Sequence, residues 1–138
     1  MSFLLDTNAV SEFTKLRPDP AFTSWLDKQN VESLWTSALV VGEVWFGIVP
    51  LEAGPKREGL EAWMASMIAS FGPRLLPVDL PVATTWAEVT HRHKRALRTV
   101  SATDELIAAT AIVHDLTVVT RNVRDFEASG CKLLSPWT

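Results

Sequence analysis

Isolated carboxylates beside apolar segments are the residues of this sequence whose types and positions could do chemistry. Asp6 and Asp125 each follow an apolar segment, and Asp104 precedes one. Glu43 is the only charged residue in the segment Ala38–Val49. An ionised carboxylate is costly in apolar surroundings unless it is paired or bound to a metal ion. These four acids are therefore candidate metal ligands.

Each acid also has a structural interpretation. Asp6, Asp104 and Asp125 suit the start of a helix, where an acid caps the chain or favours the helix dipole. Glu43 suits a gap at the protein surface. Carboxylates that converge on one rim, however, repel one another and raise each other's pKa unless cations neutralise them. One or two Mg²⁺ ions with oxygen ligands would do so, and such ions can orient a water and stabilise the leaving oxygen in phosphodiester cleavage.

Short apolar strands that alternate with helices must position these acids. The predicted strands are Phe3–Leu5, Val31–Thr36, Leu75–Val78, Leu116–Thr120 and Lys132–Leu134. The predicted helices are Thr7–Lys15, one through Phe22, Trp25 and Leu26, Ala38–Val49, one that opens at Pro55, Pro81–Leu97 and Ala102–His114. The alternation predicts an α/β domain with a mostly parallel sheet, in which ligands bind outside the carboxyl ends of the strands. The strongly apolar helix at Ala38–Val49 is expected to be buried on most sides.

The composition indicates one domain, residues 1–138, because 138 residues with 47% apolar content leave little room for two. No apolar run reaches the roughly 18 residues that span a bilayer, and the first residues lack the pattern of a signal peptide. Cys131 is the only cysteine, so it cannot form an intrachain disulfide. We therefore expect a soluble cytoplasmic protein with no membrane partner.

A basic stretch is the feature that most suits a polyanionic partner. The net charge of −3 argues against a protein that coats nucleic acid without specificity. The segment His91–Arg95, followed by Arg98, is nevertheless densely basic. It fits either a surface that binds a polyanion or an ordinary solvated helix face.

Four sequence blocks together resemble the signature blocks of PIN domains, and in particular the VapC/FitB-like toxins of bacterial and archaeal toxin–antitoxin modules. The blocks are Leu4–Asn8, Gly42–Ile48, Asp104–Ala111 and Val119–Phe126. Their order and spacing agree with the family, and the segment Ser135–Trp137 resembles an ending common in that group. The resemblance covers essentially the whole chain.

The resemblance implies a three-layer α/β/α domain with a short, mostly parallel central sheet. It also implies a Mg²⁺- or Mn²⁺-dependent endoribonuclease that cleaves tRNA-like or other structured RNA by a metal-activated water. The implied partners are a cognate antitoxin protein and a second copy of the chain, in a homodimer or a higher-order complex with the antitoxin.

The family's metal site is carried over onto Asp6, Glu43 and Asp104, with a fourth acid from the last block. Asn122 stands there where some relatives have aspartate, so Asp125 is the acid available. Supporting roles are expected for three nearby residues and RNA contacts for four basic ones. These are Asn8, Thr120 and Asn122, and Arg92, Lys94, Arg95 and Arg121.

The aromatic content predicts a surface for a partner. The chain has six tryptophans and no tyrosine, and exposed aromatic patches mark partner sites. We expect a partner peptide to dock near the helices that carry Trp25, Trp45, Phe46 and Trp63, although Trp45 equally suits the core.

Other classes of protein fit the sequence less well. A haloacid dehalogenase-type phosphatase needs a second aspartate where Asn8 stands. His91, His93 and His114 have no nucleophile motif around them, so we expect surface histidines rather than a Ser/His/Asp hydrolase. Nucleotide-binding glycine loops are absent from the sequence. The alternative that stays open is a catalytically inactive PIN-like module that binds an antitoxin or a nucleic acid.

Overall fold

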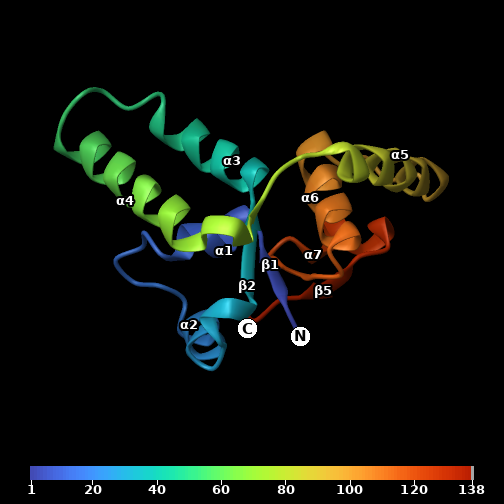
Figure 1. The fold of residues 1–138 in the computed structure, drawn as a ribbon, viewed down its shortest axis with the longest axis horizontal. Helices are drawn as coiled ribbons and strands as arrows, with labels where there is room; N and C mark the ends of the chain where they lie inside the picture. The colour runs from blue at the N-terminus through green and yellow to red at the C-terminus, as the bar shows by residue number, and fades with distance from the viewer. Residues whose placement is uncertain (138) are drawn as a thin grey trace.

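A five-stranded parallel sheet forms the centre of the computed structural model, which describes residues 1–137 (Figure 1). The strands lie in the order β3-β2-β1-β4-β5, and each neighbouring pair is parallel. Their bounds are β1 Phe3–Leu5, β2 Leu34–Ser37, β3 Leu75–Leu76, β4 Thr117–Val119 and β5 Lys132–Leu134. The predicted α/β class and short parallel sheet are confirmed.

The strand order places a topological switch point beside β1. Leu4 of β1 pairs with Trp35 of β2 on one side and with Val118 of β4 on the other. The chain therefore runs outward through β2 and β3, crosses back, and runs outward again through β4 and β5. In open α/β sheets, ligands bind at such a point, outside the carboxyl ends of the strands. Asp6 follows β1 and Thr120 follows β4 at this point.

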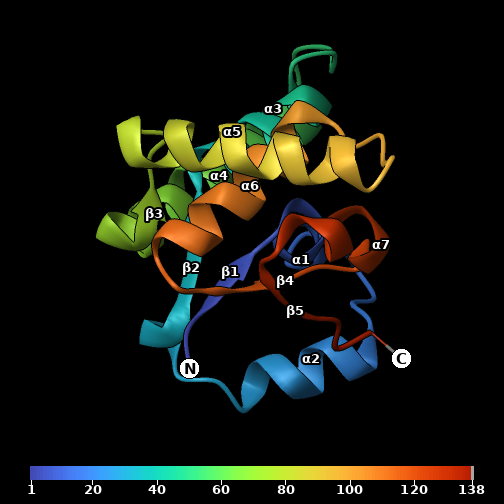
Figure 2. The ribbon, with the colours of Figure 1, turned by 90° about the vertical axis from the view of Figure 1, so that its right-hand side faces the viewer.

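Helices cover both faces of the sheet, as Figure 2 shows with α2 on one side and α5 and α6 on the other. Their bounds are α1 Thr7–Glu12, α2 Pro20–Asp27, α3 Ala38–Ile48, α4 Pro55–Phe71, α5 Leu80–Arg95, α6 Ala102–Val113 and α7 Val123–Phe126. Serine side chains cap two of the helices, since Ser37 and Ser101 accept hydrogen bonds from the backbone amides of Leu39 and Asp104. Within residues 1–137, none of these helices combines the length and the apolarity that a membrane crossing requires.

Two element boundaries differ from the prediction for local reasons. The helix expected to reach Lys15 ends at Glu12, because the amides of Thr14 and Lys15 bond to carbonyls only three residues back. The strand expected from Val31 begins at Leu34, after a 3₁₀ turn over Val31–Ser33. The guanidinium of Arg74 fixes this turn by donating to the carbonyls of Val31 and Leu34.

The expectation that α3 is buried on most sides is wrong. Val40 and Ile48 are its buried residues, whereas Phe46 is 75% exposed and Val49 is also exposed. The helix packs against α1, α4 and α6, which cover one face and leave the other open. An apolar helix of this composition therefore combines a packed face with an uncovered apolar one.

The expectation of three surface histidines is wrong for His93, although His91 and His114 are exposed. His93 is only 2% exposed, and its Nδ1 lies 2.7 Å from Oε2 of Glu105 across the α5–α6 interface. The buried positions Val82, Val89 and His93 recur at helical spacing on α5. This periodicity was present in the sequence and places His93 on the packed face.

Candidate metal centre

Three carboxylates from separate elements meet at the carboxyl ends of β1 and β4. Asp6 follows β1, Glu43 lies in α3 and Asp104 in the first turn of α6. One oxygen from each of these acids lies within 4.8 Å of the others. The structure thus brings together three of the four acids that the sequence singles out.

Asp6 is the most buried member of this acidic triad, with 3% of its surface exposed. It stands at the N-cap position of α1, but its side chain makes no capping hydrogen bond. Its Oδ2 accepts a hydrogen bond of 2.8 Å from the Thr120 hydroxyl, whereas the buried Oδ1 has no partner among the described residues. The capping interpretation therefore does not account for this carboxylate.

Burial and mutual repulsion raise the pKa values of two members of the triad, Asp6 and Asp104. Desolvation raises the pKa of Asp6 from an ordinary 3.8 to about 6, opposed by the Thr120 hydrogen bond and reinforced by the charges of Asp104 and Glu43. The pKa of Asp104 is also raised, first by burial and then by the charges of Glu43 and Asp125. The protein alone therefore holds these carboxylates in a state that a cation would relieve.

Hydrogen bonds to hydroxyl groups hold the Glu43 side chain and the backbone at Asp104. The Thr7 hydroxyl donates to Glu43 Oε1 at 2.5 Å, so the side chain of Glu43 turns toward α1 and is half-buried. Ser101 caps α6 by accepting from the Asp104 backbone amide at 3.2 Å. The capping role in α6 thus belongs to Ser101, and the Asp104 carboxylate lines the cavity described next.

A polar cavity of about 420 Å³ opens onto the triad. It is lined by Asp6, Thr7, Asn8, Ser11, Lys15, Glu43, Ser101, Asp104, Arg121 and Asn122. Lys15 and Arg121 are the two cationic residues in this lining. The cavity thus combines a group of acids with two cations, which suits a substrate that is anionic and a reaction that needs a metal ion.

The three residues predicted to support the site form one hydrogen-bonded group. The Thr120 hydroxyl accepts from Asn8 Nδ2 at 3.4 Å and from the Asn122 backbone amide at 3.0 Å. Asn8 Oδ1 accepts from the Arg121 backbone amide at 3.1 Å. Because Thr120 also donates to Asp6, this group ties the loop after β4 to the triad.

Asp125 lies near the triad without joining it. It is half-buried on α7 and is neither in the three-acid cluster nor in the lining of the cavity. Its charge nevertheless raises the pKa of Asp104. Asn122 occupies the N-cap position of α7 without making a capping hydrogen bond. Its side chain is therefore free to face the cavity that it lines.

Of the four basic residues predicted to contact RNA, only Arg121 lines the cavity. Arg92, Lys94 and Arg95 lie on α5 away from that lining. The Arg92 guanidinium donates to the Ser129 carbonyl at 2.7 Å and packs on Gly130, where a Cβ would lie 2.6 Å from Nη1. Gly130 also has φ +89°, so a side chain there is disfavoured twice. Arg92 thus holds α5 to the segment before β5.

Sequence reasoning missed Thr7, Ser11, Lys15 and Ser101 as cavity residues. Thr7, Ser11 and Lys15 are spaced four residues apart, which places polar side chains on one face of a helix. That polar stripe was the available signal. Ser101 directly precedes a predicted helix, as capping residues do, but its place in the cavity depends on how α6 packs in the fold.

Comparisons with known proteins decide the family. The sequence matches the PIN domain over residues 3–129. The chain belongs to the PIN-domain family. The resemblance expected from the four sequence blocks is thereby confirmed.

This PIN domain has similar relatives along its whole length. It is 35% identical over 135 residues to a VapC ribonuclease of Sinorhizobium fredii, covering 97% of this chain and 96% of that protein. It is 37% identical over 135 residues to toxin FitB of Neisseria gonorrhoeae, covering 97% of each. A chain in the solved structure of FitAB bound to a DNA fragment superposes with a TM-score of 0.92 at 36% identity, covering 99% of this chain and 96% of that chain.

The residues of the PIN domain fit a divalent cation. Three carboxylates offer oxygen ligands within 4.8 Å of one another, and the buried Oδ1 of Asp6 lacks a partner among the described residues. Hard cations such as Mg²⁺ and Mn²⁺ prefer this donor set. Hydroxyl groups on Thr7 and Thr120 already orient two of the carboxylates, as outer-sphere partners of metal ligands do.

The raised pKa of Asp6 predicts how stability depends on pH in chelator. Its folded-state pKa of about 6 lies above the ordinary 3.8. The contribution of Asp6 to the free energy of unfolding should therefore be largest below pH 4. It should fall by about 3 kcal/mol as pH rises through 6. Urea unfolding followed by tryptophan fluorescence measures this.

Asp6→Asn is the control for the pH prediction, because the amide keeps the shape and removes the titration. Its unfolding free energy should change less between pH 4 and pH 7 than that of the wild type. Added Mn²⁺ should stabilise the wild type most at the upper end of the range. Identical pH profiles for the variant and the wild type would refute the role given to Asp6.

Proposed function

We propose that this protein is the toxin of a toxin–antitoxin module and cleaves RNA as a Mg²⁺- or Mn²⁺-dependent endoribonuclease. The observation that carries the proposal is the triad of Asp6, Glu43 and Asp104 at the switch point of the sheet. Whole-length similarity to proteins named VapC ribonuclease and toxin FitB supports the same activity. The 420 Å³ cavity is open and polar, as a polynucleotide substrate requires.

Asp6, Glu43 and Asp104 would hold the metal ion. When bound, the ion would supply charge stabilisation for the phosphodiester oxygens and lower the pKa of the attacking water. Thr120 and Thr7 keep the carboxylates of Asp6 and Glu43 in one orientation through their hydroxyl hydrogen bonds. This preorganisation means that little rearrangement accompanies the reaction.

Asn122 and Asp125 would orient the attacking water and add a fourth negative charge near the metal ion. The Asn122 side chain lines the cavity and can orient a water through its amide group. Asp125 supplies a further negative charge close to Asp104, which its effect on the pKa of Asp104 supports. In this proposal Asn122 and Asp125 together replace the single acid that some relatives carry in this block.

An inactive binding module is the alternative function. The crowding of three carboxylates argues against it, since desolvation and repulsion raise the pKa of Asp6 to about 6 at a cost in stability. A domain that only binds a partner gains nothing from that cost.

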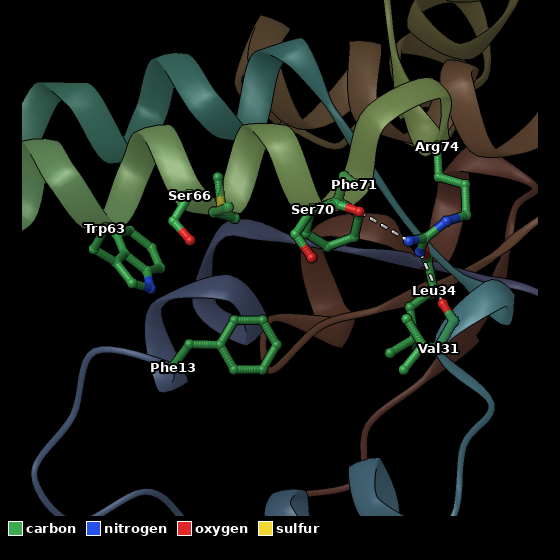
Figure 3. A pocket seen from close by; sticks show the side chains of 9 residues that line it. Phe13, Val31, Leu34, Trp63, Ser66, Ser70, Phe71 and Arg74 are labelled. Carbon is green, nitrogen blue, oxygen red and sulfur yellow. Dashed lines mark hydrogen bonds between the residues drawn. The ribbon is translucent and has the colours of Figure 1, made fainter.

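A groove between α4 and α1 is the surface that we propose for the antitoxin. It encloses about 270 Å³, and Figure 3 shows Trp63 and Ser66 from α4 facing Phe13, which directly follows α1, across it. Two of the similar solved structures are of FitAB bound to a DNA fragment and of FitAcB from Neisseria gonorrhoeae. Of the four aromatic residues predicted to lie near the docking surface, Trp63 lines this groove. Phe46 borders a different cavity, which Glu43 also lines. The homodimer remains a prediction.

We predict that Asp6→Asn abolishes RNA cleavage and leaves the fold intact. The substitution removes one metal carboxylate but relieves repulsion within the triad, so stability in chelator should be equal or higher. Purified protein free of antitoxin is incubated with mixed cellular RNA and Mn²⁺, with and without chelator. Wild-type protein that leaves RNA intact under all metal conditions would instead support the binding module.

We predict a smaller loss for Asp125→Asn, on the order of tenfold in activity, with partial rescue by added Mn²⁺. The reason is that Asp125 acts beside the triad rather than within it. Asn122→Asp should be tolerated. An Asp125→Asn variant that matches wild type across a metal titration would leave Asp125 as a helix-start residue only.

We predict that Ser66→Arg prevents a cognate antitoxin from binding to this protein. Ser66 is exposed and lines the groove, so a long charged side chain should fill the groove without disturbing the core. Ala65→Arg is the matched control, because Ala65 is exposed on the same helix outside the groove lining. Co-purification measures binding, and equal binding by both variants would place the antitoxin elsewhere.

A further inference from the structure

Two cationic residues, Lys15 and Arg121, line the acidic cavity. An RNA contact is predicted for Arg121, whereas Lys15 has no role in the proposed function. Lys15 follows the end of α1, and Arg121 lies in the loop after β4. Among the ion pairs of the described residues, neither cation is paired with an acid of the triad. Lys15 pairs instead with Glu12 and keeps 45% of its side chain exposed, whereas Arg121 forms no ion pair within residues 1–137. Both cations line the cavity and can contact an anion that enters it.

Lys15 is held in place by a buried carboxylate. Its Nζ lies 2.9 Å from Oε2 of Glu12 and 3.2 Å from Oε1. Glu12 is 1% exposed, and its Oε1 also accepts from the Asp19 backbone amide at 3.2 Å. Burial alone would raise the pKa of Glu12, but the hydrogen bonds from Lys15 and Asp19 outweigh it and leave the pKa lowered. Glu12 is thus a fixed anion that anchors Lys15 at the cavity.

Arg121 is held in place by an aromatic stack. Its guanidinium carbon lies 5.5 Å from the centroid of the Trp137 ring, in a cation–π contact. Trp137 is 9% exposed and stacks on Phe22, with ring centroids 4.8 Å apart and an interplanar angle of 12°. Glu12 and Trp137 are both buried, and each supports one of the two cations.

We propose that Lys15 and Arg121 form a phosphate clamp that grips the backbone of a single-stranded RNA segment beside the scissile bond. In this proposal Glu12 and Trp137 are positioning residues that hold the clamp. The inference rests on the proposed function, because it names how the substrate of that site is bound.

The chemistry of the two cations favours phosphate over other anions. A substrate that approaches three carboxylates needs compensating positive charge close to the reacting bond. Arg121 offers a planar guanidinium that can donate two parallel hydrogen bonds to one phosphate, while Lys15 offers a compact ammonium for the next. The stacked ring under Arg121 limits its motion, so less freedom is lost when the phosphate binds.

The clamp is tested by the salt dependence of RNA binding in chelator, where cleavage is prevented. A fluorescein-labelled single-stranded RNA is titrated with the full chain, and anisotropy gives Kd at several salt concentrations. Arg121→Ala and Lys15→Ala should each weaken binding about fivefold and reduce the slope of log Kd against log salt by about 0.7.

Lys132→Ala is the matched control for charge. It also removes one positive charge, but Lys132 begins β5 at the opposite, amino end of the parallel sheet and pairs with Asp115. Its Kd and slope should equal those of the wild type. A loss with Lys132→Ala as large as that with Arg121→Ala would overturn the proposal, since only general charge would then matter.

The positioning role is tested by a double-mutant cycle. Trp137→Leu should reproduce most of the change in salt slope that Arg121→Ala causes, whereas Trp137→Phe should keep the wild-type slope. The double variant with Trp137→Leu and Arg121→Ala should lose no more slope than Arg121→Ala alone. Glu12→Gln should have the corresponding effect through Lys15. A Trp137→Leu protein that melts at a lower temperature but keeps the wild-type slope would show a purely structural role for Trp137.

The same assays separate failure of the clamp from failure of the proposed nuclease. If the wild type cleaves RNA with Mn²⁺ while Lys15→Ala and Arg121→Ala keep the wild-type Kd and slope, the clamp is wrong and the nuclease stands. If the two variants lose binding in chelator but no RNA is cut under any metal condition, the clamp stands and the nuclease is wrong.

Discussion

Repulsion among carboxylates that the fold forces together is the constraint on which the site depends. Asp6 is almost fully buried, and Glu43 and Asp104 lie within a few ångströms of it. Each acid sits on an element whose position is set by the core rather than by the acid itself. Burial and repulsion therefore raise the pKa of Asp6. A cation bound among the three acids would relieve this repulsion.

The parallel sheet supplies the rigidity that this arrangement needs. β1 lies between β2 and β4, so its carboxyl end is fixed on both sides by backbone hydrogen bonds. Thr36 of β2 also donates to the Leu5 carbonyl at 3.0 Å, directly before Asp6. Because β1 is buried along its whole length, the position of Asp6 follows from the packing of apolar residues.

The neutral and the cationic residues around the triad have different roles. Neutral hydroxyl and amide groups on Thr7, Asn8 and Thr120 orient the acids and the loop without changing the net charge. The cations contact other residues, Lys15 pairing with Glu12 and Arg121 lying over Trp137. A cation paired directly with the triad would compete with a metal ion for the same oxygens. The separation keeps both a cation-binding centre and an attractive edge for a polyanion.

The sequence by itself determined the α/β class, the parallel sheet and the three acids of the triad. It could do so because local signals carry this information: apolar runs mark strands, caps and prolines mark helix starts, and a lone charge such as Glu43 is conspicuous in an apolar helix. The sequence also contains the helical spacing that buries His93 and the polar stripe through Thr7 and Lys15. Neither pattern indicates which other element packs against that face.

Only the tertiary structure decided the contacts between residues far apart in the chain. Thr120 meets Asp6, Arg121 meets Trp137, and Thr7 meets Glu43 because the strand order brings β1 beside β4 and α1 beside α3. The open face of α3 likewise depends on which helices happen to cover it. Sequence periodicity fixes the faces of single elements, whereas the pairing of faces is set by the packing of the whole core, and that packing positions the site.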